Sequence, residues 1–415
     1  MNEIRNILIG YELGAKTSQL CYYDRKNQEP LSIPTKVGTS LYDFPTALCK
    51  IEGRNEWHFG LEAEYFGHQP GGIYISDLYE RCQSATPSII DNTSMEPWEL
   101  LEVFLRESLR MLGIQDLRKA IGGIMMTCQS LDKIFVQNVR KAYEHMGFSK
   151  EKYYIQDFRE SFYYYTMNQK PEIWSRKAAL YTFASDQVAF EELSADHKTR
   201  PAMVQLQNLQ QTSLAELPEQ RDREFREFIE QTMRSGMFSS VFITGEGFDK
   251  EWAKQSVPLL CSGHRHVFYG NNLFVKGACF AAKEKTEEKN LKNYLYLGQD
   301  LVRTNLGMEM LVSGVSAYYP LIVAGVNWYE AVQECELILD DKDSLTFLVH
   351  RMEGGEKKAY SMPLPGLPER PNRATRLHLK AECDAPDKCL VTVEDMGFGE
   401  LFPTSKKVWR ETLTF

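Results

Sequence analysis

The spacing of hydrophobic residues switches between strand-like and helix-like patterns along the first 290 residues. Short apolar runs at 6–12, 120–128 and 240–244 predict buried strands. Residues 97–112 carry apolar side chains at helical spacing behind Pro97, a residue tolerated in a first helical turn, and so predict an amphipathic helix. Further helices are expected at 130–146, 217–233 and 274–284, and further strands at 20–24, 44–51, 56–60 and on either side of a turn within 177–192. This alternation indicates an α/β fold.

Beyond Tyr294 the pattern changes to strand-length segments separated by turns. Strands are expected at 337–339, 344–351, 358–362, 375–382 and 388–394. In one of them Leu377, Leu379 and Ala381 alternate with charged or polar residues, as is typical of a half-buried strand. We therefore expect 291–415 to form a β-rich, sandwich-like C-terminal domain after the charged run at 283–289.

Composition narrows the possible environments and partners. The chain has 415 residues, 43% hydrophobic and 25% charged, and a formal net charge of -9. That negative charge argues against nucleic acid and against an anionic membrane as partners. The N-terminus lacks the apolar core of a signal peptide, no apolar run has the length of a spanning helix, and the nine cysteines include no C-x-x-C pair. We expect a cytoplasmic protein with reduced thiols.

Several residue types with catalytic or metal-binding potential fit ordinary structural roles better. Cys261, His264 and His266 lack a fourth ligand and are expected in a surface turn, so no metal site is predicted from them. Cys128 ends an apolar strand and is expected in the core. The sequence contains none of the common nucleophile-elbow, zinc-protease, Walker or dinucleotide-binding patterns.

A more informative pattern lies at Ile9–Ser18, where a strand ends in acidic Glu12 and continues into a turn with Gly14. A glycine in such a turn lets phosphate oxygens approach the backbone N–H groups. This segment resembles the first phosphate loop of the actin and DnaK-type (heat-shock 70-like) ATPases. In that family the acidic position is an aspartate, one methylene shorter than Glu12, which orders water around magnesium.

Other segments resemble the same superfamily in the same order. Residues 44–60 resemble its early strand pair, and residues 121–165 resemble the first connecting region, with Asp157 in place of the family's glutamate. Residues 241–248 resemble the adenosine motif, and residues 271–282 resemble the closing helix. The resemblance implies an actin-like ATPase (ribonuclease H-like) domain of duplicated lobes over 1–290, with lobe I at about 1–176 and lobe II at about 177–290.

The resemblance also implies roles for individual residues. Glu12, Gly14, Lys16 and Thr17 would contact phosphate or hydrated metal. Asp157 would help to order water, and Gly245 and Gly247 would border the nucleoside. ATP and Mg are the cofactors that this assignment implies.

Two departures from the family pattern affect the expected activity. In the second phosphate loop Thr182 stands at the aspartate position and residues 181–187 contain no glycine. A Gln-rich segment at 205–211, expected to be a loop, and one charged helix stand where DnaK-type domains carry a whole subdomain. We expect a DnaK-like protein that binds nucleotide weakly or is a pseudo-ATPase, and that engages another protein. An active chaperone-like ATPase and a small-molecule kinase of the same superfold are the alternatives.

Overall fold

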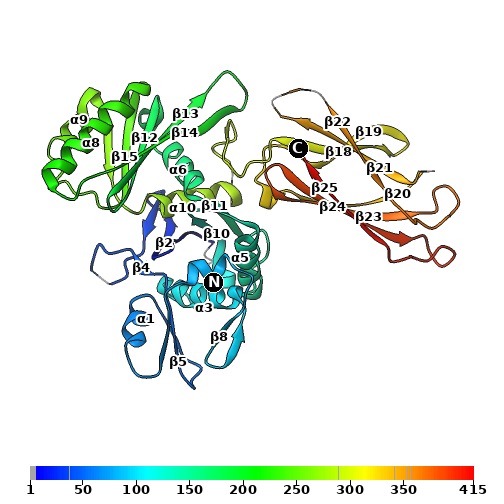
Figure 1. Cartoon of the computed structure of the whole chain (residues 1–415), viewed down its shortest axis with the longest axis horizontal. Helices are drawn as coiled ribbons and strands as arrows, with labels where there is room; N and C mark the ends of the chain where they lie inside the picture. The colour runs from blue at the N-terminus through cyan, green and yellow to red at the C-terminus, as the bar shows by residue number, and fades with distance from the viewer. Residues whose placement is uncertain (1–5, 37, 288, 341, 353, 356) are drawn as a thin grey trace. The chain divides into compact units, whose positions relative to one another are not determined.

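The computed structural model describes the chain except for residues 1–5, 37, 288, 341, 353 and 356. The chain divides into two compact units, 1–296 and 297–415, and each is described here by itself. The first unit mixes helices with several sheets, and the second is built from strands (Figure 1). The charged run expected near the boundary includes residue 288, which lies outside the described residues.

The first sheet of unit 1 combines an antiparallel hairpin with parallel strands. Its strands are β1 (Ile7–Leu13), β2 (Thr17–Asp24), β3 (Glu29–Ser32), β10 (Ile121–Cys128) and β11 (Tyr153–Asp157), and the short β4 (Phe44–Pro45) pairs with β2. The spatial order is β11-β10-β1-β2-β3. Strands β1, β2 and β3 are antiparallel neighbours, whereas β10 and β11 continue the sheet in parallel with β1.

A second sheet repeats this arrangement later in the chain. Its strands are β12 (Lys177–Ala184), β13 (Gln187–Asp196), β14 (Ala202–Ser213), β15 (Phe238–Glu246), β16 (His266–Tyr269) and β17 (Tyr294–Tyr296). The order is β16-β15-β12-β13-β14-β17. Strands β12, β13 and β14 are antiparallel neighbours, and β15 and β16 run parallel to β12. The series β16-β15-β12-β13-β14 therefore has the same spatial order and the same relative strand directions as β11-β10-β1-β2-β3 in the first sheet.

Two helices lie between these sheets, α6 (Phe158–Met167) and α10 (Leu273–Thr286), and they pack against each other (Figure 1). Glycine allows both close approaches of α10. A Cβ on Gly10 of β1 would overlap the Val275 carbonyl, and one on Gly277 would overlap the Ser161 carbonyl of α6. The contacts bring the N-terminal half of α10 directly against β1.

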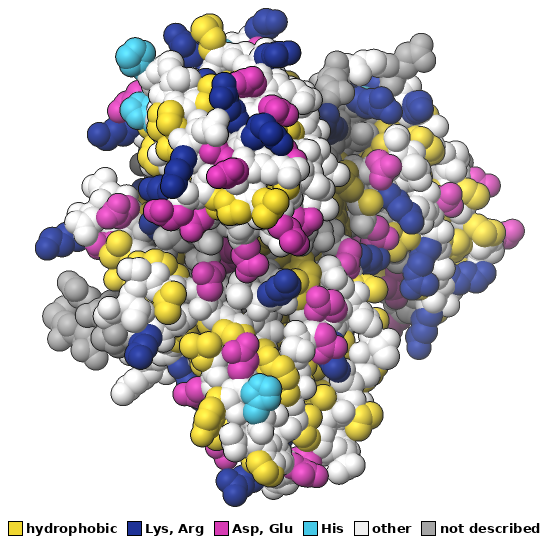
Figure 2. Space-filling view, turned by 60° about the vertical axis from the view of Figure 1, so that its left-hand side comes forward, with side chains coloured by type: hydrophobic (Ala, Val, Ile, Leu, Met, Phe, Trp, Pro, Cys, Tyr) yellow, Lys and Arg dark blue, Asp and Glu magenta, His cyan; other side chains and the backbone are white. Residues whose placement is uncertain are grey.

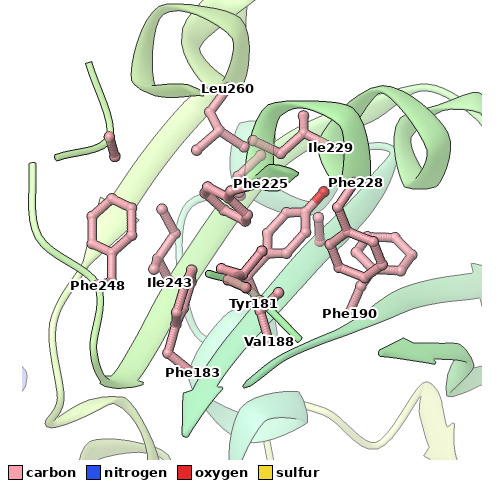
Figure 3. Packing of buried hydrophobic residues seen from close by; sticks show 14 of the residues in the cluster. Tyr181, Phe183, Val188, Phe190, Phe225, Phe228, Ile229, Ile243, Phe248 and Leu260 are labelled. Atoms are coloured by element: carbon pink, nitrogen blue, oxygen red, sulfur yellow. The ribbon is translucent and has the colours of Figure 1, made fainter. Parts of the chain in front are cut away.

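The outer faces of both sheets are covered by amphipathic helices. On the first sheet, the Tyr11 hydroxyl lies 2.9 Å from that of Ser108 in α3 (Pro97–Leu109), and α3 packs against α5 (Lys133–His145). Helix α3 begins with Pro97 and a reciprocal cap between Glu96 and Glu99. On the second sheet, aromatic residues of α8 (Pro218–Thr232) and Leu260 of α9 (Ser256–Cys261) cover the side chains of β12 and β13 (Figure 3).

Smaller elements complete unit 1. They are α1 (Gly60–Gly67), α2 (Leu78–Cys82), α4 (Leu117–Ala120), α7 (Pro171–Trp174), the three-stranded sheet of β5 (Leu48–Ile51), β6 (Trp57–Phe59) and β7 (Gly72–Ile75), and the hairpin of β8 (Ser88–Ile90) and β9 (Thr93–Met95). The strand expected at 44–51 is thus divided between β4 and β5, which belong to different sheets.

Unit 2 contains two four-stranded antiparallel sheets. One has the order β19-β18-β21-β22 and the other β20-β23-β24-β25. The strands are β18 (Thr304–Val312), β19 (Val315–Ile322), β20 (Val332–Ile338), β21 (Ser344–Arg351), β22 (Lys358–Pro363), β23 (Arg376–Ala385), β24 (Lys388–Gly397) and β25 (Val408–Thr414). Leu377, Leu379 and Ala381 are buried on one face of β23, as their alternation predicted.

The sequence interpretation of 205–211 as a loop is wrong, because this segment is part of the long strand β14. Its backbone pairs with β13, and its glutamines are tolerated because few of their side chains need to be buried there. The expected end of the first domain at 290 precedes β17, which pairs with β14 through Ala202–Val204 and lies within unit 1.

Candidate functional site

A row of polar side chains crosses the face of the first sheet that is turned toward α10. Glu12 of β1 pairs in register with Gln19 of β2 and with Thr127 of β10, and Thr127 pairs with Gln156 of β11. Register partners project from the same face of a sheet, so the four side chains form one row. Three of the four are almost fully buried: Gln19, Thr127 and Gln156 are at most 3% exposed.

Ser161 of α6 forms hydrogen bonds with the two members of this row that lie on β10 and β11. The Gln156 Nε2 group donates to Ser161 Oγ at 2.6 Å, and Ser161 Oγ donates to Thr127 Oγ1 at 2.7 Å. The oxygens Glu12 Oε2, Gln19 Oε1 and Gln156 Oε1 are buried and make no hydrogen bond within the described part of the chain. Buried acceptors without donors are costly unless water or a ligand satisfies them, so this row is a candidate binding surface.

Glu12 also meets the N-terminal turn of α10. The backbone N–H of Val275 donates a hydrogen bond to the Glu12 carboxylate, which favours its charged form. Burial acts in the opposite direction and is the larger effect, and the charge of Asp43 adds to it. Together they raise the pKa of Glu12 to about 8, so that this group is mostly protonated at neutral pH.

Asp43, Glu246 and Asn271 extend the site from the first sheet to the second. Gln19 Nε2 donates to Asp43 Oδ1 at 2.8 Å and to the Asn271 carbonyl at 2.7 Å. The Asn271 side chain accepts in turn from the Gly245 N–H at 3.0 Å. Burial raises the pKa of Asp43, and the nearby Glu246 carboxylate at the end of β15 also raises it. The site is therefore acidic on both sides. Figure 2 shows Asp and Glu side chains gathered across the middle of one face of the molecule.

The β1–β2 hairpin places the remaining predicted residues of the first loop. The Gly14 N–H donates to the Thr17 carbonyl at 3.1 Å and closes the turn. A Cβ on Gly14 would overlap that carbonyl, which explains the glycine. Lys16 is exposed, its carbonyl accepts from the Thr46 N–H at 2.9 Å, and Thr17 starts β2. Lys16 thus places an exposed cation at the tip of the β1–β2 hairpin.

The two predicted nucleoside-side glycines lie at the end of β15 and just beyond it. Gly245 and Gly247 have φ values of 95° and 106°, a region that favours glycine. A Cβ on Gly247 would overlap the Ser185 carbonyl in the β12–β13 turn. The Arg221 guanidinium donates to the carbonyls of Ser185 and Gly247 and lies over the Trp252 ring. Arg221 therefore closes the second hairpin turn.

Asp157 has a structural task at the end of β11. Its Oδ1 accepts from the Glu160 N–H at 2.6 Å, so Asp157 caps the N-terminus of α6. Strand alternation directs Asp157 to the face opposite that of Gln156. Gln156, which sequence reasoning passed over, lies in the row with Glu12, and Gln19 and Asp43 were missed in the same way. The register of the predicted strands was the one signal that could have selected Gln19 and Gln156.

Other residues singled out from the sequence add no ligand to this site. Cys261 ends α9, and His264 and His266 follow at the surface. Within the described ranges, no three His, Cys, Asp or Glu side chains form a group that could hold a metal ion. Cys128 is buried. No helix in the part of the chain that the structure describes has the length and apolarity required to cross a bilayer.

Two family models match the chain, and together they cover most of it. The model described as "Family of unknown function (DUF5716) C-terminal" matches residues 29–299, and the one described as "Domain of unknown function (DUF8552)" matches residues 301–415. The change from one match to the other falls a few residues after the structural division between Tyr296 and Leu297. No curated protein matches the chain.

Proposed function

We propose a function for this chain, which belongs to the DUF5716 family of unknown function, from the arrangement around Glu12. The chain is a DnaK-like protein with actin-type duplicated lobes. It binds a magnesium–nucleotide complex weakly between its two sheets, turns ATP over very slowly or not at all, and engages another protein. The main support is the repeated strand order of the two sheets, with the polar row that contains Glu12 facing the helices between them.

The residues present fit a hydrated magnesium ion that is shared with phosphate. Magnesium is commonly held by one or two carboxylates together with substrate phosphates. Glu12, with its buried oxygen free of hydrogen bonds, and Asp43 would supply these carboxylates. When bound, the ion would neutralise phosphate charge that the acidic site would otherwise repel. Lys16 is the cation that the hairpin offers to a phosphate oxygen, and Gly245 would border the nucleoside.

The second hairpin supports slow or absent turnover. Thr182 occupies in β12 the place that Glu12 has in β1, because each lies at the same distance from its hairpin turn. A threonine hydroxyl cannot supply the charge of a carboxylate. The turn itself presents the Ser185 carbonyl to Arg221 rather than N–H groups to a phosphate. Phosphoryl transfer depends on positioned charge, so these losses reduce the rate.

Isothermal titration of the full chain with Mg-ATP, combined with a phosphate-release assay, tests the proposal. We expect weak binding that strengthens as the pH rises through about 8, because a deprotonated Glu12 attracts the metal. Glu12→Gln should remove this pH dependence, whereas Glu172→Gln, a change of the same kind on exposed α7, should retain it.

The alternatives give different results in the same assays. Tight binding with measurable hydrolysis that Glu12→Ala abolishes would establish an active chaperone-like ATPase instead. A small-molecule kinase would consume ATP only when a particular acceptor is present. Failure of nucleotide to bind between pH 6 and 9, by both calorimetry and equilibrium dialysis, would exclude a nucleotide function.

A further inference from the structure

Strand β14 has an open edge over most of its length. On one side β14 pairs with β13 from Met203 to Ser213, and on the other β17 pairs with Ala202–Val204 alone. Beyond Val204, no described strand is bonded to the outer edge of β14. Backbone N–H and C=O groups along such an edge can pair with an additional strand.

The residues of this edge do little to prevent such pairing. Residues 202–213 contain no charged residue and no proline, which are the usual protections of an edge strand. A bulge at Asn208, whose φ is 60°, interrupts the hydrogen-bond ladder between β13 and β14. On the two sides of the bulge, Phe190 pairs with Gln210 and Glu192 pairs with Gln207. The bulge leaves the segment 210–213 as a regular stretch of edge.

A pocket of about 620 Å³ adjoins this same segment. Residues 210–213 line one side, Glu224, Glu227 and Gln231 of α8 line the other, and the largely buried Phe228 also contributes. Gln210 and Thr212 pair with Phe190 and Val188, whose side chains pack beneath α8, so these two side chains project toward the pocket.

The charge of the pocket is negative. It has two glutamates, and neither Lys nor Arg is among the residues that line it. Hydrogen bonds from Gln220 and from the Ala215 N–H lower the pKa of Glu224, so this carboxylate is ionised at neutral pH. Glu227 is exposed on the same helix face one turn later. The pocket thus complements a Lys or Arg side chain, and its carboxamides can bond to peptide groups.

We propose that an extended basic segment of a partner protein adds a strand to β14 at 210–213 and inserts a Lys or Arg side chain between β14 and Glu224 and Glu227 of α8. The backbone ladder supplies contacts that are independent of sequence, and the acidic pocket selects the cationic side chain. This binding does not require nucleotide, and its test is carried out without nucleotide.

Fluorescence anisotropy of a labelled peptide with four Lys-Thr repeats, titrated with the full chain, tests this proposal. A peptide with four Glu-Thr repeats and a Lys-Thr peptide N-methylated at every backbone nitrogen are measured in parallel. We expect the Lys-Thr peptide to bind and both others to bind at least about tenfold more weakly, because one lacks the cation and the other cannot form the ladder. Hydrogen exchange should slow in 205–213 when the Lys-Thr peptide is present.

Charge reversal locates the binding site. Glu227→Lys should weaken binding of the Lys-Thr peptide at least about tenfold, whereas Glu172→Lys on α7 changes the net charge equally and should leave it unchanged. Both residues are exposed, so neither change should prevent folding. Equal binding of the N-methylated peptide, equal binding of the Glu-Thr peptide, or unchanged exchange in 205–213 would each overturn the proposal. Displacement of the peptide by spermine together with insensitivity to N-methylation would indicate a cation pocket without strand addition.

Discussion

Glu12 lies in a strand, yet its carboxylate is withdrawn from solvent and faces the first turn of α10. The hydrogen bond from the Val275 N–H favours the charged form, but it does not offset the loss of hydration. A charged Glu12 is therefore destabilising in the folded protein. The consequence can be measured as a dependence of stability on pH.

We predict that the free energy of unfolding contains a contribution from Glu12 that is lost as the pH rises. The unfolded chain releases this proton near its ordinary pKa of 4.5, whereas the folded chain retains it to about 8. Between these values the folded state binds more protons, so stability falls with increasing pH. When urea unfolding is measured at several pH values from 5 to 8, the free energy of unfolding of Glu12→Gln should decrease less steeply with pH than that of the unsubstituted chain. An unchanged slope would contradict the burial of Glu12, and Glu172→Gln is the control.

Gly277 is the residue on which the contact between α6 and α10 depends. We predict that Gly277→Ala destabilises the chain by about 1–3 kcal/mol, because the added methyl group would overlap the Ser161 carbonyl in a packed interface. Gly270→Ala is the control, because the nearest group to an added Cβ on Gly270 would be the Asn272 side chain, at 3.6 Å. Urea unfolding of both variants checks the prediction. Equal stability would mean that the two helices separate easily.

At the scale of elements, β24 is fixed by a buried ion pair. The Arg370 guanidinium donates to both Asp395 oxygens, at 2.7 and 2.8 Å, and the side chains are 4% and 0% exposed. Asp395 also accepts from the backbone N–H groups of Gly397 and Ser405. The hydrogen bonds from Arg370 hold the pKa of Asp395 well below its usual range.

We predict that Arg370→Met destabilises unit 2 by about 3–5 kcal/mol, since it leaves a buried carboxylate without its partner. Arg373→Met removes an exposed pair with Asp340 and should have a much smaller effect, because solvent screens that pair. Hydrogen exchange in β23 and β24 of the full chain distinguishes the two variants. Because the pKa of Asp395 is lowered, its stabilising contribution is present above its ordinary pKa of 3.8 and is lost as the pH falls further. Similar exchange in both variants would show that the pair contributes little.

At the scale of the whole molecule, the position of the unit boundary can be tested by truncation. Strand β17 follows the predicted boundary at 290, and its Tyr296 ring stacks on that of Tyr163 with centroids 4.9 Å apart. We predict that a chain ending at 296 unfolds at a higher temperature than one ending at 290, which loses Tyr294 and Tyr296. Burial of a large apolar side chain contributes roughly 1.5–3 kcal/mol. Thermal melting followed by circular dichroism checks this prediction. The melting temperature of Tyr296→Ala in the full chain, compared with that of the unsubstituted chain, measures the contribution of the Tyr296 side chain. Equal melting temperatures would place β17 outside the cooperative unit.

The sequence by itself determined most elements of this protein. The periodicity of apolar residues predicted strands at 6–12 and 120–128, which the structure has at 7–13 and 121–128. It also predicted the helix from Pro97 and the change to strands after Tyr294, because local side-chain spacing reflects which face is buried. A glycine was expected in the turn after the first strand, and Gly14 lies there because a Cβ would overlap the Thr17 carbonyl three residues later. Sequence reasoning failed at β14, where half-buried and exposed glutamines obscured a strand that backbone pairing with β13 maintains.

Tertiary structure alone decided which polar groups meet. Gln19, Asp43 and Gln156 are ordinary polar residues in the sequence, and strand register and the crossing of α10 bring them beside Glu12. Asp157 adjoins Gln156 in the chain, yet it caps α6. The open edge of β14 and the acidic pocket beside α8 likewise exist because strands and helices distant in sequence pack together. The burial, the strand register and the pKa of a side chain depend on the residues that surround it, and the fold determines which residues these are.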